Sequence, residues 1–201
     1  NSEAVANYFN NGNACFVLPN MIHCSHFNVG PAPSAAYLTV GMLSSNLPKK
    51  GLLDFVRLAQ WCLDNEVATK FKLFGPDNEH IQDLHSNSNW PANLMCCGYV
   101  EDPSLALAAL DVVVNLSHVK ETFGRSVLEA MAASRCVIVY DWGALPELVK
   151  PGCGFIVPFK DINAVAACLV QLTANRALLL KTASAAKKHV EQHYGQTTFT
   201  E

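Results

Sequence analysis

Short apolar segments alternate with segments of helical periodicity along most of the chain. The expected strands are rich in aliphatic and β-branched residues and cover 14–18, 37–41, 70–75, 93–97, 111–117, 137–140 and 155–157. The expected helices carry apolar residues on one side and cover 2–11, 52–62, 80–84, 104–109, 145–149, 162–172 and 177–194, with one more beginning at about 125. Such alternation is typical of a parallel sheet with helices on both faces. We therefore predict an α/β fold built on a doubly wound parallel sheet.

The composition of the chain argues against several classes of function. Half of the 201 residues are hydrophobic and 15% are charged, which is typical of a folded domain with a large core. The net charge is −3 and no basic stripe is present, so we expect no nucleic-acid partner. No apolar run approaches the roughly 20 residues of a membrane span, and residues 1–3 do not resemble a signal peptide. We expect no transmembrane segment and a cytoplasmic protein, which in full length could be peripheral at the inner membrane face.

Cysteine and histidine spacings give little support for a metal or a disulfide framework. The eight cysteines form no C-x-x-C pair and most lie in apolar runs, Cys96 and Cys136 among them, so we expect buried thiols in a reducing compartment. His23 with His26, and His189 with His193, have the spacing of metal-ligand pairs but lack a third ligand nearby. We expect no metal site and no cofactor.

One stretch combines a strand, a glycine turn and the start of a helix. The expected strand 111–117 leads to Glu121, and Gly124 lets the backbone approach a ligand without a side chain in the way. The free N–H groups of a helix that begins at about Arg125 would form an anion site at the end of that strand, where ligands of open α/β sheets bind. Glu121 and Glu129 lie on either side of this anion site, where their carboxylates can accept hydrogen bonds from hydroxyl groups of a ligand. A ligand with a central phosphate and polyols at both ends, such as a sugar nucleotide, fits this arrangement.

The same residues also have a purely structural interpretation. Ser126 and Glu129 have the spacing of a capping box, in which the Glu129 side chain would bond to the backbone N–H of Ser126. His118, close to the turn, is expected to be a satisfied loop residue. The motifs elsewhere in the chain favour ligand contact for Glu129 over capping.

Four motifs in order resemble those of retaining GT-B glycosyltransferases of family four, glycosyltransferases group 1. The stretch ETFGRSVLEAMAAS at 121–134 resembles the family pattern E-G-F-G-x-x-x-x-E-A-M-A-x-G. The other three matching stretches are VLPNMIHCSHF at 17–27, YLTVGML followed by KKG at 37–51, and GALPELVKPGCGFIVPFKD at 143–161. The resemblance covers nearly the whole chain.

The resemblance implies a Rossmann-like fold that forms the C-terminal half of a GT-B enzyme. Residues 1–201 would be a single nucleotide-sugar-binding domain, and the N-terminal acceptor domain would lie outside this chain. The implied reaction moves a hexose from a UDP- or GDP-linked donor to an acceptor hydroxyl of a carbohydrate or lipid-linked molecule, in polysaccharide, lipopolysaccharide or glycolipid biosynthesis. The family needs no metal, and the chain on its own is expected to be inactive.

The resemblance also assigns roles to individual residues. Lys50 and Glu121 take the catalytic roles: Lys50 offsets charge on the diphosphate, and Glu121 binds hydroxyls of the transferred sugar. Glu129 would accept hydrogen bonds from the ribose, and Gly75, Tyr99 and Val100 would lie near the base. The full set of implied donor contacts is Gly41, Met42, Lys50, Gly75, Tyr99, Val100, Phe123, Gly124, Arg125, Ser126 and Glu129.

Departures from the family pattern leave a second function open. Met42 stands where the family has an arginine that partners the lysine on the diphosphate, and Thr122 and Ser134 replace signature glycines. Lys49 or Arg125 could supply the missing charge; otherwise transfer would be slow, or the chain would be a non-catalytic sugar-nucleotide or partner-binding module. A dinucleotide-binding oxidoreductase is disfavoured because no G-x-G-x-x-G follows an expected strand.

Overall fold

The computed structural model describes residues 2–9, 20–30, 36–86 and 90–195, and its core is one parallel sheet. Within these residues the strands are β1 (Leu38–Leu43), β2 (Thr69–Phe74), β3 (Leu94–Gly98), β4 (Val112–Asn115), β5 (Cys136–Tyr140) and β6 (Phe155–Val157). Their order across the sheet is β3-β2-β1-β4-β5-β6. The predicted strand at 14–18 lies outside the described residues.

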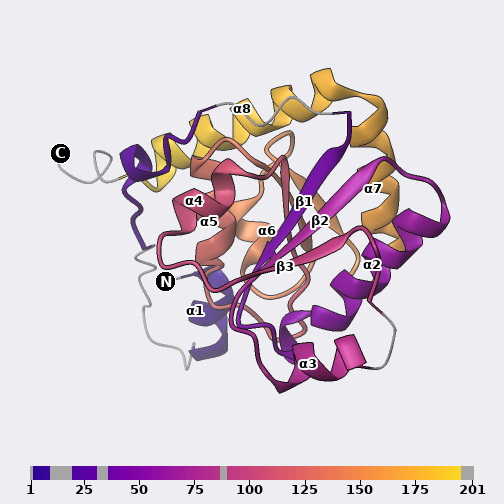
Figure 1. Ribbon diagram of the computed structural model, residues 1–201. Coiled ribbons are helices and arrows are strands. Elements are labelled where there is room, and N and C mark those ends of the chain that lie inside the picture. The colour runs from indigo at the N-terminus through magenta and orange to yellow at the C-terminus, as the bar shows by residue number, and fades with distance from the viewer. Residues whose placement is uncertain (1, 10–19, 31–35, 87–89, 196–201) are drawn as a thin grey trace.

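Helices cover both faces of this sheet, as Figure 1 shows. One face is covered by α2 (Leu52–Asp64), α3 (Glu79–Ser86) and α7 (Ile162–Ala174), and the other by α4 (Pro103–Ala108), α5 (Arg125–Ala132), α6 (Leu145–Leu148) and α8 (Arg176–His193). The remaining helical elements are α1 (Glu3–Phe9) and the 3-10 turns η1 (Cys24–Phe27) and η2 (Pro48–Lys50). The prediction of a doubly wound, Rossmann-like parallel sheet is confirmed.

The central strands are mainly apolar because each of their faces is buried. In β4, Val112 and Val114 pack with α2 and α7, whereas Val113 packs with α5 and α8. In β5, likewise, Ile138 packs on the side of α2 and α7, and Val139 packs on the side of α5 and α8. Side chains of successive strand residues point to opposite faces, so a strand between two helix layers needs apolar residues at every position.

The strand order places a topological switch between β1 and β4. From β1 the chain continues outward through β2 and β3, and from β4 it continues outward in the other direction through β5 and β6. The two strands pair in parallel through Val40 with Val112 and Gly41 with Val113. Connections leave this pair towards opposite sides, and the resulting crevice at the carboxyl ends of the strands is where open α/β sheets bind ligands.

Buried charge at the opposite, amino edge of the sheet ties elements together. Asp111 comes immediately before β4, and its Oδ2 accepts a hydrogen bond from the backbone N–H of Thr39, at the start of β1, at 2.8 Å. Its Oδ1 accepts from Nη2 of Arg176, the first residue of α8, at 2.7 Å. A buried carboxylate is tolerated when its oxygens are matched in this way. Asp111 therefore fastens α8 to the β1–β4 pair.

No single helix among the described residues combines the length and the apolar character needed to cross a membrane. The helices α7 and α8 have that length and composition when taken together, but the chain bends by 110° between them.

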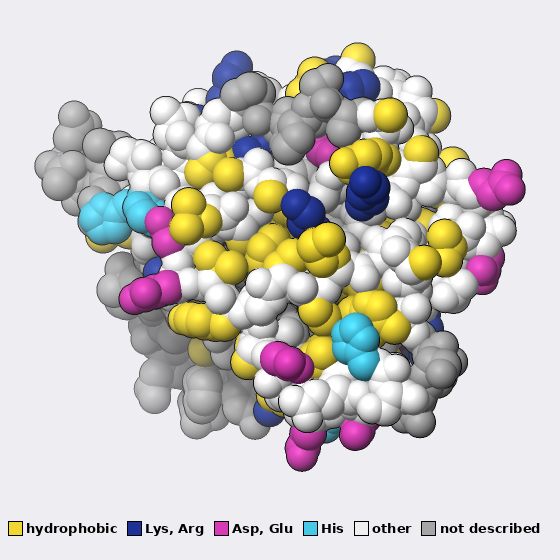
Figure 2. All heavy atoms as spheres, in the orientation of Figure 1, with side chains coloured by type: hydrophobic (Ala, Val, Ile, Leu, Met, Phe, Trp, Pro, Cys, Tyr) yellow, Lys and Arg dark blue, Asp and Glu magenta, His cyan; other side chains and the backbone are white. Residues whose placement is uncertain are grey.

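The cysteines differ in burial more than the sequence predicted. Cys62 and Cys136 are buried, and burial raises the pKa of their thiols to about 11 and about 12. Cys96 is exposed, so its predicted burial was wrong: β3 is an edge strand, and no strand among the described residues pairs with its outer side. Figure 2 shows hydrophobic side chains gathered over this part of the surface, where Met95, Tyr99 and Leu105 are exposed.

Candidate functional site

A central cavity of about 310 Å³ lies at the carboxyl ends of β1 and β4. The loop after β1, the end of β4 and the first turn of α5 form its walls. Its lining residues are Met42, Leu43, Ser44, Ser45, Lys50, Val114, Asn115, Leu116, Glu121, Gly124, Arg125 and Ser126. This is the position at which the sequence predicted an anion site.

Lys50 and Glu121 form an ion pair in this cavity. The Lys50 Nζ lies 2.6 Å from the Glu121 Oε1, and both side chains are partly buried. Lys50 ends η2, directly before Gly51, which adopts a left-handed φ of 83°. A Cβ on Gly51 would lie 2.0 Å from the backbone O of Leu116, so the glycine allows the lysine loop to rest against the end of β4.

Two backbone contacts fix the segment that carries Glu121. The N–H of His118 donates to the O of Lys49 at 2.9 Å, which ties this segment to the lysine loop. On its other side, the N–H of Ala144 donates to the O of Glu121 at 2.9 Å. A Cβ on Gly143, whose φ is 64°, would lie 2.7 Å from the Glu121 N. The loop after β5 therefore packs directly against the backbone of Glu121.

The first turn of α5 faces the same cavity without a side-chain cap. Gly124 is the N-cap residue, with a left-handed φ of 88°, and no side chain bonds to the first-turn N–H groups. The backbones of Arg125 and Ser126 therefore present donors beside Lys50, and the positive end of the helix dipole adds to the charge there. This combination of lysine and helix N-terminus suits an anion such as a phosphate.

The capping-box interpretation of Ser126 and Glu129 was wrong. The helix begins at Arg125, so Ser126 lies inside the first turn and not at the cap position. The Glu129 Oε1 accepts a hydrogen bond from the Arg125 Nε at 2.8 Å. The helix begins at Arg125, as the glycine turn predicted, because Gly124 with its positive φ takes the cap position two residues before Ser126.

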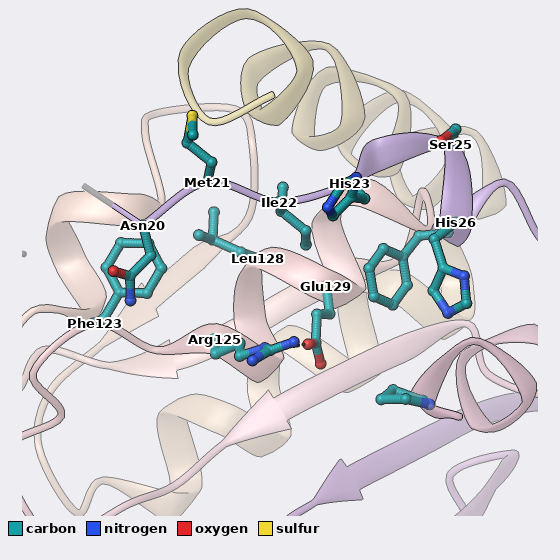
Figure 3. Close-up of a pocket in the computed structure, with 12 residues that line it drawn as sticks. Asn20, Met21, Ile22, His23, Ser25, His26, Phe123, Arg125, Leu128 and Glu129 are labelled. Atoms are coloured by element: carbon teal, nitrogen blue, oxygen red, sulfur yellow. Dashed lines mark hydrogen bonds and ion pairs between the residues drawn. The ribbon is translucent and has the colours of Figure 1, made fainter. Parts of the chain in front are cut away.

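Glu129 borders two further cavities. An outer cavity of about 850 Å³ is lined by Asn20, Met21, Ile22, His23, Ser25, His26, Phe27, Pro103, Phe123, Arg125, Leu128 and Glu129. Figure 3 shows Arg125 and Glu129 facing each other at its edge, below the segment that runs from Asn20 to His26. A side cavity of about 430 Å³ is lined by Leu43, Ser44, Phe74, Gly75, Tyr99, Val100, Glu101, Pro103, Ala106, Arg125, Ser126 and Glu129.

The structure gathers the predicted site residues around these three cavities, with one exception. Gly41 lines none of them, because it lies inside β1, where a Cβ would come within 2.2 Å of Leu110 Cδ1. Its lack of a side chain is explained by core packing. Met42 borders the central cavity but is only 1% exposed and belongs to the core, so it brings no charge to the position at which the family has an arginine.

A buried polar cluster behind the central cavity was not predicted from the sequence. The Asp54 Oδ2 lies 2.6 Å from the His118 Nε2 and accepts a hydrogen bond from the Tyr140 hydroxyl at 2.9 Å. Burial and this bond to Asp54 raise the pKa of Tyr140, so its hydroxyl stays protonated and donating. The expectation that His118 is a satisfied loop residue is confirmed. These three residues come from separate elements, and no local spacing signals their contact.

The N-terminal segment that borders the outer cavity was also missed as a source of site residues. It contributes Asn20, His23 and His26, and its signal in the sequence was the motif at 17–27, whose residues 17–19 lie outside the described part. The His26 Nε2 lies 2.9 Å from the Asp102 Oδ1, which fastens η1 to the N-cap of α4. Within the described ranges, no group of three or more His, Cys, Asp or Glu side chains could hold a metal ion.

Fold and site together define an α/β domain with a candidate anion site at its topological switch point. The family model described as glycosyl transferases group 1 matches residues 35–175. The chain belongs to this family of glycosyltransferases.

A curated relative and two solved structures show how far the similarity extends. The poly(ribitol-phosphate) alpha-N-acetylglucosaminyltransferase of Staphylococcus aureus (strain COL) is 25% identical over 166 residues, which is 81% of this chain and 34% of that protein. The chain therefore spans about a third of that relative's length. A mutant of S. aureus TarM in complex with fondaparinux, alpha-GlcNAc-glycerol and UDP has a TM-score of 0.78 at 23% identity, covering 96% of this chain and 39% of that one. Anabaena HepE in complex with UDP and glucose has a TM-score of 0.77 at 21% identity, covering 89% and 52%.

Proposed function

We propose that this chain binds the nucleoside diphosphate sugar in a retaining hexosyltransferase, with UDP as the first candidate for the nucleotide. The observation that carries the proposal is the Lys50–Glu121 ion pair of 2.6 Å beside the uncapped N-terminus of α5, at the switch point between β1 and β4. A cation, free backbone donors and a hydroxyl acceptor meet there within one cavity. Both of these solved structures are complexes with UDP, which supports this choice of nucleotide.

The three cavities suggest how such a donor would lie. The diphosphate would occupy the central cavity, against the Lys50 Nζ and the N–H groups of Arg125 and Ser126. The transferred sugar would reach the Glu121 carboxylate, and the ribose would reach Glu129 from the side cavity. The base would then lie near Tyr99 at the carboxyl end of β3.

This arrangement has a direct use in glycosyl transfer. When the bond between the anomeric carbon and the β-phosphate oxygen breaks, its electron pair stays on the nucleoside diphosphate. The acceptor oxygen forms the new bond to the anomeric carbon, and the proton of the acceptor hydroxyl passes to the departing phosphate. Positive potential that is fixed before the reaction stabilises this developing charge more than it stabilises the ground state. Lys50 and the α5 N-terminus would supply that potential, and the acceptor would be held by parts of the protein outside this chain.

A non-catalytic donor-binding module is the second candidate, because the buried Met42 removes one cation from the diphosphate site. The two candidates share donor binding and differ in turnover. Tight nucleotide binding by the whole protein, without transfer or donor hydrolysis, would favour the module.

A thermal-shift panel with UDP, GDP, ADP, CDP and free phosphate tests donor binding. A ligand at about 100 times its dissociation constant adds about 2.7 kcal/mol to the free energy of unfolding, which raises the midpoint of a domain of this size by a few degrees. We expect one nucleoside diphosphate to give this shift and free phosphate to give none. Lys50→Ala should shrink the shift, whereas Lys49→Ala, an exposed lysine that borders none of the three cavities, should not. A folded sample that responds to no nucleotide would contradict the proposal.

A further inference from the structure

Arg125 occupies a singular position among the residues of the site. It is the first residue of α5 and lines all three cavities. Its side chain is 86% exposed, yet its Nε donates to the Glu129 Oε1, whose side chain is 7% exposed. Within the described residues this is its one side-chain contact, so the terminal amino groups of the guanidinium face solvent.

The central cavity has few charged side chains to offer a diphosphate. Lys50 and Arg125 are the described cations that line it, and Lys50 is already matched by Glu121 at 2.6 Å. Met42 borders the same cavity without a charge. A nucleoside diphosphate that met only Lys50 and Glu121 would face side chains of zero net charge. Arg125 is the other described cation of this lining, and a turn of its guanidinium towards the diphosphate would add its charge to that of Lys50 and the N-terminus of α5.

We propose that Arg125 exchanges partners when the donor binds: its guanidinium leaves Glu129 and grips the diphosphate, and this releases the Glu129 carboxylate for the ribose hydroxyls. The inference rests on the proposed function. An arginine is suited to the exchange because its planar fork can hold two phosphate oxygens at once. The Glu129 carboxylate, once released, keeps a hydrogen-bonding partner, because the ribose hydroxyls replace the arginine.

The exchange couples recognition of the phosphates to recognition of the ribose. A nucleoside without phosphates has to compete with Arg125 for Glu129, and it offers the displaced guanidinium no new partner. A nucleoside diphosphate satisfies both side chains. The exchange thus makes the site bind nucleosides less tightly than nucleoside diphosphates. This difference in affinity adds to the one that comes from the direct phosphate contacts.

Isothermal titration of the 201-residue chain with UDP and uridine tests the exchange, with GDP and guanosine used instead if the nucleotide panel selects guanine. Uridine binding is measured by its competition with UDP. Arg125→Ala should weaken UDP binding by about 10- to 100-fold, the range for loss of a hydrogen bond between charged groups. Uridine affinity should stay the same or rise, because Glu129 is no longer occupied. Arg125→Lys, which keeps the charge but loses the fork, should fall between wild type and alanine, and Lys49→Ala should match wild type.

Two results would overturn the exchange. Unchanged UDP affinity in Arg125→Ala would show that the diphosphate does not use this side chain. An equal loss for UDP and for uridine would show that Arg125 serves only to hold Glu129 in place. Neither result touches donor binding itself, whose failure would instead appear as absence of UDP or GDP binding by the wild-type chain.

Discussion

Lys50 and Glu121 are 71 residues apart in the sequence and meet because glycines let their loops come close to neighbouring backbone. Gly51 allows the lysine loop to touch Leu116, and Gly143 allows the loop after β5 to touch Glu121. The sequence predicted both charged residues from their motifs, but their 2.6 Å contact could not be predicted because it depends on how three loops pack. Gly41 differs from these two glycines: the motif assigned it to the donor site, and the structure places it inside β1, where it makes room for Leu110.

The contact between Gly143 and Glu121 predicts that one added methyl group at position 143 lowers both stability and donor affinity. Gly143→Ala should destabilise the fold and weaken donor binding by about tenfold, because the new Cβ would have to displace the Glu121 backbone. Gly152→Ala is a matched control: its φ is also positive, at 83°, but nothing lies within 4 Å of the added Cβ. Both variants lose about 1–2 kcal/mol from the left-handed backbone, measured by urea unfolding. Equal nucleotide affinity in the two variants would contradict this role for Gly143.

At the scale of elements, Asp54 joins three parts of the site's support. It lies in the first turn of α2, and it holds His118 in the segment before α5 and Tyr140 at the end of β5. The sequence predicted these helices and strands closely, since their apolar patterns are local. It could not predict the cluster, whose members come together only when α2 packs on the sheet.

Tyr140→Phe tests the contribution of this cluster to stability. Removing the hydroxyl leaves one oxygen of the buried Asp54 with one donor fewer, so the free energy of unfolding should fall by about 1 kcal/mol. The loss can be measured by urea unfolding at neutral pH. Tyr99→Phe, which removes an exposed hydroxyl, should leave stability unchanged. If both variants match wild type, the bond to Asp54 adds nothing to the fold.

At the scale of the whole molecule, strands that are apolar at every position predicted a sheet covered on both faces, and the structure has it. The sequence did not show the order of the strands, so it did not show that β3 lies at the edge of the sheet. Cys96 was therefore expected to be buried in a strand as apolar as the central ones. An apolar pattern indicates a strand without showing whether a neighbour covers it.

The buried thiols predict that stability declines at alkaline pH. Burial raises the pKa of the Cys136 thiol to about 12, from an ordinary value of 9.0. Between these values the unfolded chain releases this proton and the folded chain keeps it, so the free energy of unfolding falls as pH rises, by up to about 1.4 kcal/mol per pH unit.

Cys136→Ala should remove this contribution and make the pH dependence shallower when urea unfolding is compared between pH 8 and 10.5. Val137→Ala, a truncation at the adjacent buried position, should lower stability without altering the slope. A slope in Cys136→Ala as steep as in wild type would mean that this thiol titrates alike in both states.

The order of the strands also divides the molecule into two contiguous pieces. The chain up to β3 builds one half of the sheet and the chain from β4 onward builds the other. Among the six strands, β1 and β4 are the pair that joins the halves, and an isolated bridge between Ile22 and Gly195 adds a second link. Lys50 belongs to the first piece and Glu121 to the second. A molecule bound by both residues would therefore hold the two pieces together. Two fragments cut between β3 and β4 would then reassemble more readily in the presence of that molecule, which makes the domain a natural starting point for a split reporter of its own ligand.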